Sequence, residues 1–355
     1  MKITDIKVEK LPLKLLKPFK VSLGVIEQYD TIIVKIITNE GIYGVGESSP
    51  IEFVTGESVD TAIAVIKALA EKLKGMDPLD IELIHQVMDR YITNNTAAKA
   101  GIDIALFDIK GKVMGVPLYK VLGGNSNQLE TDITLSIDEP KEMAYAAKEK
   151  VDSGFKIIKV KAGIDPEMDI EAIRLIREAV GNDIKLKMDA NQGWTVADAV
   201  MVMNAVEKYG VYAVEQPRPY WDIDGTAFIR KKVNIKVMVD ESVFSPEDAI
   251  NVVKREAADI INIKLMKSGG IYKAEQINAI AQASGLSCMV GCMLESRIGI
   301  AAGAHFVASK KNILDADLDG FMVCKECEGI NGGFDIKGGT MTLYDKPGIG
   351  IDLNM

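Results

Sequence analysis

Cysteine, histidine and tryptophan are scarce in this chain of 355 residues, which has four Cys, two His and two Trp. All four cysteines lie beyond residue 287, so they form no disulfide framework for a chain of this size. Two histidines and a single Cys-x-x-Cys pair, Cys324 and Cys327, do not supply the roughly four ligands at matched spacing that a zinc site needs. The scarcity argues against a disulfide-stapled fold and against a zinc-centred one.

Long apolar runs and an excess of positive charge are also missing. Lys or Asp interrupts every long apolar stretch, so nothing approaches the roughly 18 residues of a membrane-spanning helix. The opening residues Met1–Val8 alternate like a strand and lack the apolar core of a signal peptide. Acidic residues outnumber basic ones by 51 to 42, which argues against a nucleic-acid or anionic-membrane partner. We therefore expect a soluble cytoplasmic protein.

The first 124 residues predict an α+β capping domain. Period-two alternation and an Asn39-Glu40-Gly41 turn predict an antiparallel sheet, and helical periodicity follows it. The expected strands are Lys2–Leu11, Thr31–Thr38 and Ile42–Val45, and the expected helices are Val59–Leu73, Pro78–Tyr91 and Ala97–Met114. Between the first two strands, Pro18–Gln28 is a loop long enough to act as a lid.

A different rhythm begins at Thr131, where short apolar strands alternate with amphipathic helices. Strand ends recur every 24 to 28 residues, a spacing that demands parallel strands with right-handed crossovers. We therefore predict a (β/α) barrel of the TIM type over residues 125–320, with a segment over 321–355 that packs back on the capping domain. The expected strands are Ile133–Ile137, Ile157–Lys161, Ile184–Asp189, Tyr212–Glu215, Val237–Asp240, Ile260–Lys264 and Ser287–Gly291. The expected helices include Met168–Val180, Val196–Tyr209, Pro246–Glu256 and Ile271–Ser284.

Three successive barrel strands end in a carboxylate: Asp189, Glu215 and Asp240. Strand ends meet at the carboxyl mouth of a barrel, where active sites form. Three anions crowded there repel one another unless a cation neutralises them. Oxygen-only ligands without His or Cys select a hard ion, so we predict one Mg²⁺ per subunit.

Lysines flank this predicted metal site. Lys159 and Lys161 lie two apart on one strand and so share a face, while Lys264 comes from a strand across the mouth. A second ammonium, a divalent ion and partial burial would each favour the neutral lysine, so these residues are expected to act as bases. The alternative is that the lysines merely pair with the three carboxylates.

These motifs together resemble the enolase superfamily, in its muconate-lactonising-enzyme-like subgroup. The resemblance rests on Lys-x-Lys, Asp-Ala-Asn, Glu-Gln-Pro, Asp-Glu-Ser and Asn-x-Lys-x-x-Lys-x-Gly-Gly, and it covers nearly the whole chain. Sites of that superfamily use a Lys or His base with Mg²⁺ to stabilise an ene-diolate. The resemblance implies that Asp189, Glu215 and Asp240 hold Mg²⁺. It also implies that Lys161 and Lys264 are the acid/base pair and that Lys159 steadies the substrate carboxylate.

Two further segments resemble dipeptide epimerases of that subgroup. Met293-Leu294-Glu295-Ser296 follows the seventh strand, and Asp317-Leu318-Asp319-Gly320 lies at the eighth. The resemblance implies that Glu295 binds substrate. It also implies that Asp317 and Asp319 bind the free ammonium of the dipeptide. Gly24 stands where epimerases acting on Ala-Glu carry an arginine that pairs with the Glu side chain, so an anionic second residue would lose its partner.

We therefore expect an isomerase that inverts the Cα of a dipeptide's C-terminal residue. The residues Val21, Leu23, Val25 and Ile26 of the lid, with Ile51, Phe53 and Val54, predict an apolar or aromatic C-terminal residue. Glu27, Asp30 or Glu52 would instead favour a cationic one. The same machinery also suits an o-succinylbenzoate synthase or a muconate cycloisomerase, and a catalytically silent metal-binding protein is the non-enzyme alternative. We further expect a homo-oligomer.

Overall fold

Eight parallel strands form the largest sheet of this computed structural model, which describes residues 1–16, 19–21, 24–26 and 29–354. Their spatial order follows the order in the chain, which is the arrangement of a (β/α) barrel. Two hydrogen bonds bridge the gap between the last strand and the first. Asp132 N donates to Ala316 O (3.0 Å), and Leu318 N donates to Thr131 Oγ1 (2.9 Å). The barrel prediction is confirmed. The strands are β7 (Ile133–Leu135), β8 (Ile157–Lys161), β9 (Lys185–Asp189), β10 (Val211–Glu215), β11 (Lys236–Val239), β12 (Ile260–Lys264), β13 (Ser287–Gly291) and β14 (Ile313–Asp317).

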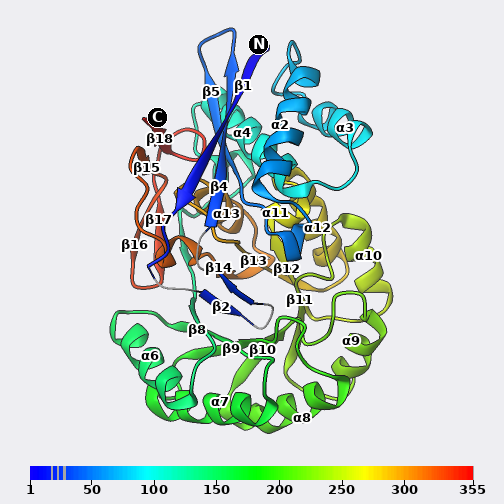
Figure 1. Cartoon of the computed structure of the whole chain (residues 1–355), viewed down its shortest axis with the longest axis vertical. Coiled ribbons are helices and arrows are strands. Elements are labelled where there is room, and N and C mark those ends of the chain that lie inside the picture. The colour runs from blue at the N-terminus through cyan, green and yellow to red at the C-terminus, as the bar shows by residue number, and fades with distance from the viewer. Residues whose placement is uncertain (17–18, 22–23, 27–28, 355) are drawn as a thin grey trace.

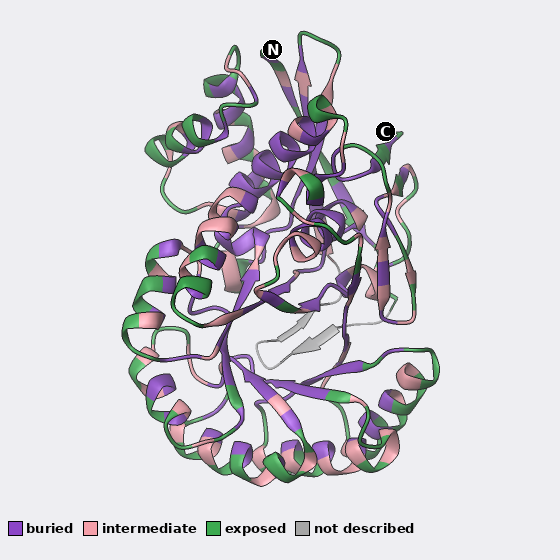
Figure 2. Ribbon diagram, turned by 180° about the vertical axis from the view of Figure 1, so that it is seen from behind, coloured by how far each residue is buried: buried purple, intermediate pink, exposed green. Residues whose placement is uncertain are grey.

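Helices cover the outside of this sheet (Figure 1). Five of them begin at N-caps whose side chains accept backbone hydrogen bonds. Asp165, for example, accepts from Glu167 N at 3.0 Å, and Thr195 and Ser245 form capping boxes. Figure 2 shows buried strands and helices whose outer faces are exposed. The predicted helix Val196–Tyr209 ends as an α-helix at Val206, and its last three residues form a 3₁₀ turn. The barrel helices are α6 (Pro140–Asp152), α7 (Pro166–Val180), α8 (Val196–Val206), α9 (Ile223–Arg230), α10 (Pro246–Lys254), α11 (Leu265–Ser268), α12 (Ile271–Ala283) and α13 (Arg297–Ser309).

An antiparallel sheet in the order β1-β4-β5 stands above the barrel mouth (Figure 1). Helix α4 lies against β5 so closely that a Cβ at Gly44 or Gly46 would stand 2.0 Å from a carbonyl oxygen of the helix. Only glycine permits that approach. The predicted helix from Pro78 begins instead at Ile81, because Leu79 N is turned toward Asp77 Oδ1 at 3.0 Å. The elements are β1 (Ile3–Leu13), β4 (Tyr29–Thr38), β5 (Tyr43–Ser48), α1 (Glu52–Thr55), α2 (Val59–Leu73), α3 (Ile81–Tyr91), α4 (Thr96–Met114) and α5 (Leu118–Val121).

The predicted lid contains a small antiparallel hairpin. Its two strands, β2 (Phe19–Val21) and β3 (Gly24–Ile26), pair Phe19 with Ile26 and Val21 with Gly24. Leu23 and Glu27 lie outside the described residues, as do the side chains over residues 17–28. The predicted specificity contacts of the lid, including the role of Gly24, therefore stay predictions.

The C-terminal segment returns to both parts of the chain. Strand β17 (Thr340–Leu343) pairs with β16 (Phe334–Lys337) and with β6 (Gln128–Glu130), while β15 (Ile330–Gly332) pairs with β18 (Ile351–Leu353). Near the lid, a 3₁₀ turn over Gly320–Val323 accepts a hydrogen bond from Leu16 N to Val323 O at 2.8 Å. The division at residues 124 and 320 stays a prediction. None of the helices in the described part of the chain has the length and apolar character that a bilayer crossing needs.

Candidate active site

The predicted site residues converge at the carboxyl ends of the barrel strands. Below them, Ala213, Met238, Ile260 and Met289 form a buried apolar cluster. Glu215 and Asp240 follow two of these residues at a spacing of two, so they share the inner face of the barrel. Above that floor lies a cavity of about 90 Å³. It is lined by Ile51, Phe53, Val54, Thr134, Lys159, Lys161, Asn191, Glu241, Lys264, Cys292, Met293, Leu294, Asp317, Asp319, Gly320 and Val323.

Lys159 links two of the predicted metal ligands. Its Nζ lies 2.9 Å from Asp189 Oδ2 and 2.8 Å from Glu215 Oε2. Lys161 approaches the same Asp189 oxygen at 2.8 Å and donates to Asn191 Oδ1 at 2.9 Å. All five side chains are buried. Two of the three predicted ligands therefore face the ammonium groups of β8.

The third predicted ligand is paired from the other side. Asp240 Oδ2 lies 2.8 Å from Lys264 Nζ, and Asp240 Oδ1 lies 2.6 Å from Lys267 Nζ. Lys267, which the sequence reading left without a role, is fully buried and also donates to Val243 O at 3.1 Å. It therefore fixes one oxygen of Asp240 and leaves the other facing the cavity lysine.

The donor set of these three carboxylates fits a divalent metal ion. In the described part of the structure, Glu215 Oε2 and both carboxylate oxygens of Asp240 are buried and accept no hydrogen bond, although each meets an ammonium in an ion pair. A carboxylate oxygen that pairs with an ammonium can pair with a metal cation in its place. An all-oxygen set of this kind matches the ligands that Mg²⁺ prefers.

The ion pairs determine the pKa values of this half of the site. Burial raises the pKa of Asp189 and of Asp240, but the lysines beside them more than offset it, so both pKa values lie below the ordinary range. Burial lowers the pKa of Lys264, yet Asp240 more than offsets it and the pKa is raised. Burial also lowers the pKa of Lys159, but Asp189, Asp317 and Glu215 more than offset it, so this pKa is raised well above its ordinary value. Both lysine pKa values are raised here because carboxylates face them, and the expected lowering, which includes the charge of a bound divalent ion, stays a prediction.

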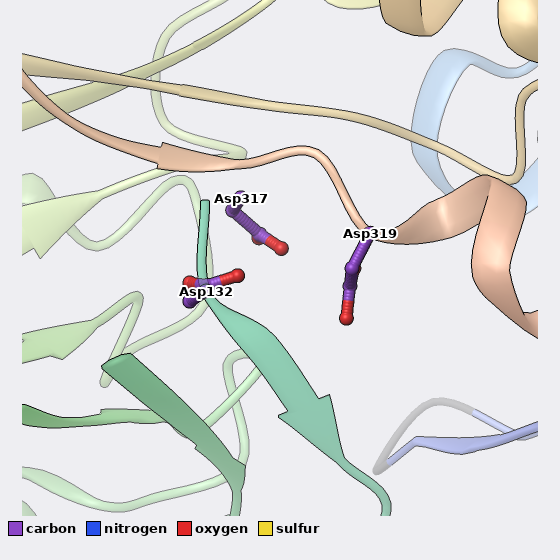
Figure 3. Close-up of side chains that lie close together, drawn as sticks. All are labelled: Asp132, Asp317 and Asp319. Carbon is purple, nitrogen blue, oxygen red and sulfur yellow. The ribbon is translucent and has the colours of Figure 1, made fainter. Parts of the chain in front are cut away.

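A second group of carboxylates lies at the β14 side of the mouth. Asp317 Oδ2 accepts from Lys159 Nζ at 2.6 Å, and Asp319 Oδ2 accepts from Thr134 N at 2.6 Å. Asp132, which the sequence reading did not single out, brings a carboxylate oxygen within 4.8 Å of one from each of these two residues (Figure 3). Burial and Asp317 raise the pKa of Asp319 to about 6. We call Asp132, Asp317 and Asp319 the aspartate cluster.

Glu295 is placed differently from the other predicted residues. It is buried but does not line the cavity; its Oε1 accepts from Met293 N at 2.8 Å. Burial and the neighbouring Glu47 raise its pKa to about 8. Among the described residues Glu295 lines a neighbouring hollow rather than this cavity, and its predicted contact with substrate stays a prediction.

Glu241 is a cavity residue to which the sequence reading gave no role. Burial and the adjacent Asp240 raise its pKa to about 7, and its Oε2 is buried without a hydrogen bond in the described structure. Its position directly after a predicted ligand was the available signal. Residues two apart on a strand share a face, as stated for Lys159 and Lys161. By the same rule, Lys187 shares with Asp189 the face that points into the barrel.

Two family models match the chain. Residues 3–123 match the mandelate racemase / muconate lactonizing enzyme N-terminal domain, and residues 142–355 match the enolase C-terminal domain-like model. A hydrophobic dipeptide epimerase of Enterococcus faecalis is 47% identical over 320 residues, which is 90% of each chain. An L-Ala-D/L-Glu epimerase of Clostridium acetobutylicum is 42% identical over 99% of each chain. The crystal structure of a dipeptide epimerase from Enterococcus faecalis, in complex with Mg and L-Leu-L-Tyr, matches with a TM-score of 0.97 at 45% identity, covering 99% of this chain and 100% of that one.

Proposed function

The chain belongs to the mandelate racemase / muconate lactonizing enzyme family of the enolase superfamily, and from that premise we propose that it is a Mg²⁺-dependent dipeptide epimerase. It inverts the Cα of the C-terminal residue: the α-proton is removed from one face of that carbon, and a proton is added to the opposite face. The observation that carries this proposal is the pair of lysines at the cavity. Lys161 and Lys264 come from β8 and β12, four strands apart, and both line the cavity.

The two lysines divide the proton transfer between them. One takes the α-proton from its face of the substrate, and the other returns a proton to the opposite face. Removal of the proton leaves negative charge on the substrate carboxylate, and Lys159, which lines the cavity, would hold that charge. Mg²⁺ held by Asp189, Glu215 and Asp240 would neutralise that charge. Asp189 and Asp240, with a metal ion bound between them, would no longer pair with Lys161 and Lys264, and both lysines would then be free to exchange protons with the substrate.

The aspartate cluster favours a substrate with a free ammonium. Asp317 and Asp319 line the cavity on the β14 side, and carboxylates at that place attract a cation. The substrates of o-succinylbenzoate synthase and of muconate cycloisomerase have no ammonium, so they leave this charge unpaired at a desolvation cost. A silent metal-binding protein has no need of the lysine pair. The dipeptide reading accounts for both halves of the site.

The cavity walls support an apolar or aromatic C-terminal residue. Ile51, Phe53, Val54, Met293, Leu294 and Val323 supply apolar lining. Phe53, Val54 and Glu241 also border a neighbouring hollow of about 540 Å³, which the exposed rings of Tyr220 and Trp221 flank. Burial of apolar surface contributes roughly 25 cal/mol per Å². The hollow would give a large side chain room beyond the reaction centre. Glu52, Glu241 and Asp248 also line it, so a cationic residue is the second choice.

A panel of dipeptides tests this proposal. The purified protein with Mg²⁺ is incubated with Leu-Tyr, Ala-Lys and Ala-Glu, and the epimers are separated by chromatography. We expect the highest kcat/KM with Leu-Tyr, the next with Ala-Lys and the lowest with Ala-Glu. A best activity on Ala-Glu contradicts the specificity, and no epimer from any dipeptide contradicts the reaction.

A further inference from the structure

Asp132 stands behind the two aspartates that line the cavity. It precedes β7 and is fully buried, with both carboxylate oxygens accepting no hydrogen bond in the described structure. Its one ion pair among the described residues is with Lys187, whose Nζ lies 2.5 Å away. Figure 3 shows one oxygen of Asp132 pointing toward the space between Asp317 and Asp319. A buried carboxylate aimed at two others needs a reason, since like charges this close repel.

The ammonium groups near the aspartate cluster are shared with other carboxylates. Lys187 is also 3.3 Å from Asp315 Oδ2, so two carboxylates share its single charge. Lys159 serves Asp189 and Glu215 as well as Asp317. Asp319 is held by the Thr134 backbone N–H. With all three aspartates ionised, the cluster carries more negative charge than its lysines neutralise, and the excess faces the cavity through Asp317 and Asp319. Burial and Asp317 raise the pKa of Asp132 well above its ordinary value, and a cation bound in front of the cluster favours its ionised form.

We propose that Asp132 is a specificity-determining residue that keeps the aspartate cluster negative, so that the site selects dipeptides with a free N-terminal ammonium. This inference rests on the proposed function. Asp132 does not line the cavity, so it acts through the two residues in front of it and is a positioning residue. A third carboxylate there adds attraction for a cation without occupying space that the substrate needs.

The charge change is tested with Asp132→Asn, which keeps the shape of the side chain. Affinity is measured by calorimetry with Mg²⁺ present, for Leu-Tyr and for N-acetyl-Leu-Tyr, and kcat and KM are measured with Leu-Tyr. We expect affinity for the free dipeptide to fall roughly tenfold, because one charge near the ammonium is lost, with KM raised and kcat little changed. Affinity for the acetylated dipeptide should change less than about twofold, since it has no ammonium.

Two matched variants separate charge from structure. Asp132→Asn/Lys187→Met removes a positive and a negative charge together, so the net charge of the cluster is kept and free-dipeptide affinity should stay near the wild-type value. Asp315→Asn removes the other partner of Lys187 outside the cluster and should have a smaller effect than Asp132→Asn. The double variant also serves if Asp132→Asn alone does not fold, because it removes the buried ammonium of Lys187 together with the carboxylate 2.5 Å from it.

Four outcomes overturn the role of Asp132. They are an equal loss for both dipeptides, no loss for either, loss of ammonium selectivity in the double variant, and a fall in Mg²⁺ affinity measured without dipeptide, which would mean that the cluster holds metal. The wild-type protein must invert Leu-Tyr in the same assay. If it does not, the proposed function falls together with this inference, whereas an active wild type with an unaffected Asp132→Asn refutes the inference alone.

Discussion

Aspartates on the two sides of the barrel mouth have different neighbours, and their pKa values differ accordingly. On the β8–β12 side, Asp189 and Asp240 each face two lysines, which hold their pKa values below the ordinary range. On the β14–β7 side, Asp319 faces a backbone N–H and a second aspartate, and its pKa rises to about 6. Neither side is uniform, because burial and Asp189 raise the pKa of Glu215 on the first side, and Lys159 more than offsets burial and lowers the pKa of Asp317 on the second. Asp319, which has no ion pair among the described residues, is therefore the carboxylate at the mouth best suited to a single substrate ammonium.

Removal of the metal should cause the largest loss of activity. This loss comes from the β8–β12 side of the mouth, which holds the predicted metal ligands. Excess EDTA is expected to abolish epimerisation of free and N-acetylated dipeptides alike, and Mg²⁺ or Mn²⁺ should restore it. Asp240→Asn should bind Mg²⁺ poorly in calorimetry, because it removes one of three anionic ligands. Full activity after dialysis against EDTA would show that the first half needs no metal.

Loss of either lysine should come next in size. Lys161→Ala and Lys264→Ala are each expected to lower kcat for epimerisation by roughly 10²–10⁴, the usual contribution of a positioned acid or base. Each variant keeps one base, so it can still exchange the α-proton of one epimer with solvent. Chiral chromatography and mass spectrometry read the two processes separately. Near-wild-type epimerisation by either variant would rule out the two-base mechanism.

The second half should affect binding rather than chemistry. Asp319→Asn is expected to raise KM for Leu-Tyr about tenfold or more, since a hydrogen bond to a charged group is worth roughly 1.5–3 kcal/mol. N-acetyl-Leu-Tyr should lose much less. A parallel loss on both substrates would mean that Asp319 only supports the fold near Thr134, and the contrast between the two halves would fail.

The smallest expected effect is a pH dependence confined to the second half. Asp319 has a raised pKa of about 6, so it is anionic above that pH and neutral below it. The KM for Leu-Tyr should therefore rise as the pH falls from 7 to 5, by at most about tenfold per unit for one titrating group. The N-acetylated dipeptide is the control, and an identical pH profile for both substrates would contradict the assignment.

The fold was largely predictable because its periodicities are strong. Strand Ile157–Lys161 and helix Val59–Leu73 have the predicted bounds, since apolar alternation and clear ends mark both. The start of α3 was misplaced by three residues, because Pro78 is compatible with a helix start and the turn at Asp77 competes with it. Side-chain hydrogen bonds decide whether such a segment starts a helix or forms a turn, and apolar periodicity does not predict those bonds.

The candidate site was predictable where a strand ends in a charged residue. Lys161, Asp189 and Lys264 meet at the mouth because each closes a strand. Asp132 precedes its strand rather than closing one, and its convergence with Asp317 depends on how the first and last strands meet. Glu295 follows a strand as expected, but its side chain accepts from Met293 N and does not line the cavity, which depends on the turn after the strand.

The account is tested most directly by incubating the wild-type protein with Mg²⁺ and L-Leu-L-Tyr in D₂O. Mass spectrometry locates the label, and chiral chromatography follows the configuration. The two-lysine mechanism predicts that each inverted molecule carries one deuterium, at the Cα of the C-terminal tyrosine, because the proton is returned from solvent through the opposite lysine. Inversion without deuterium, deuterium at the N-terminal residue, or no exchange at all would contradict it.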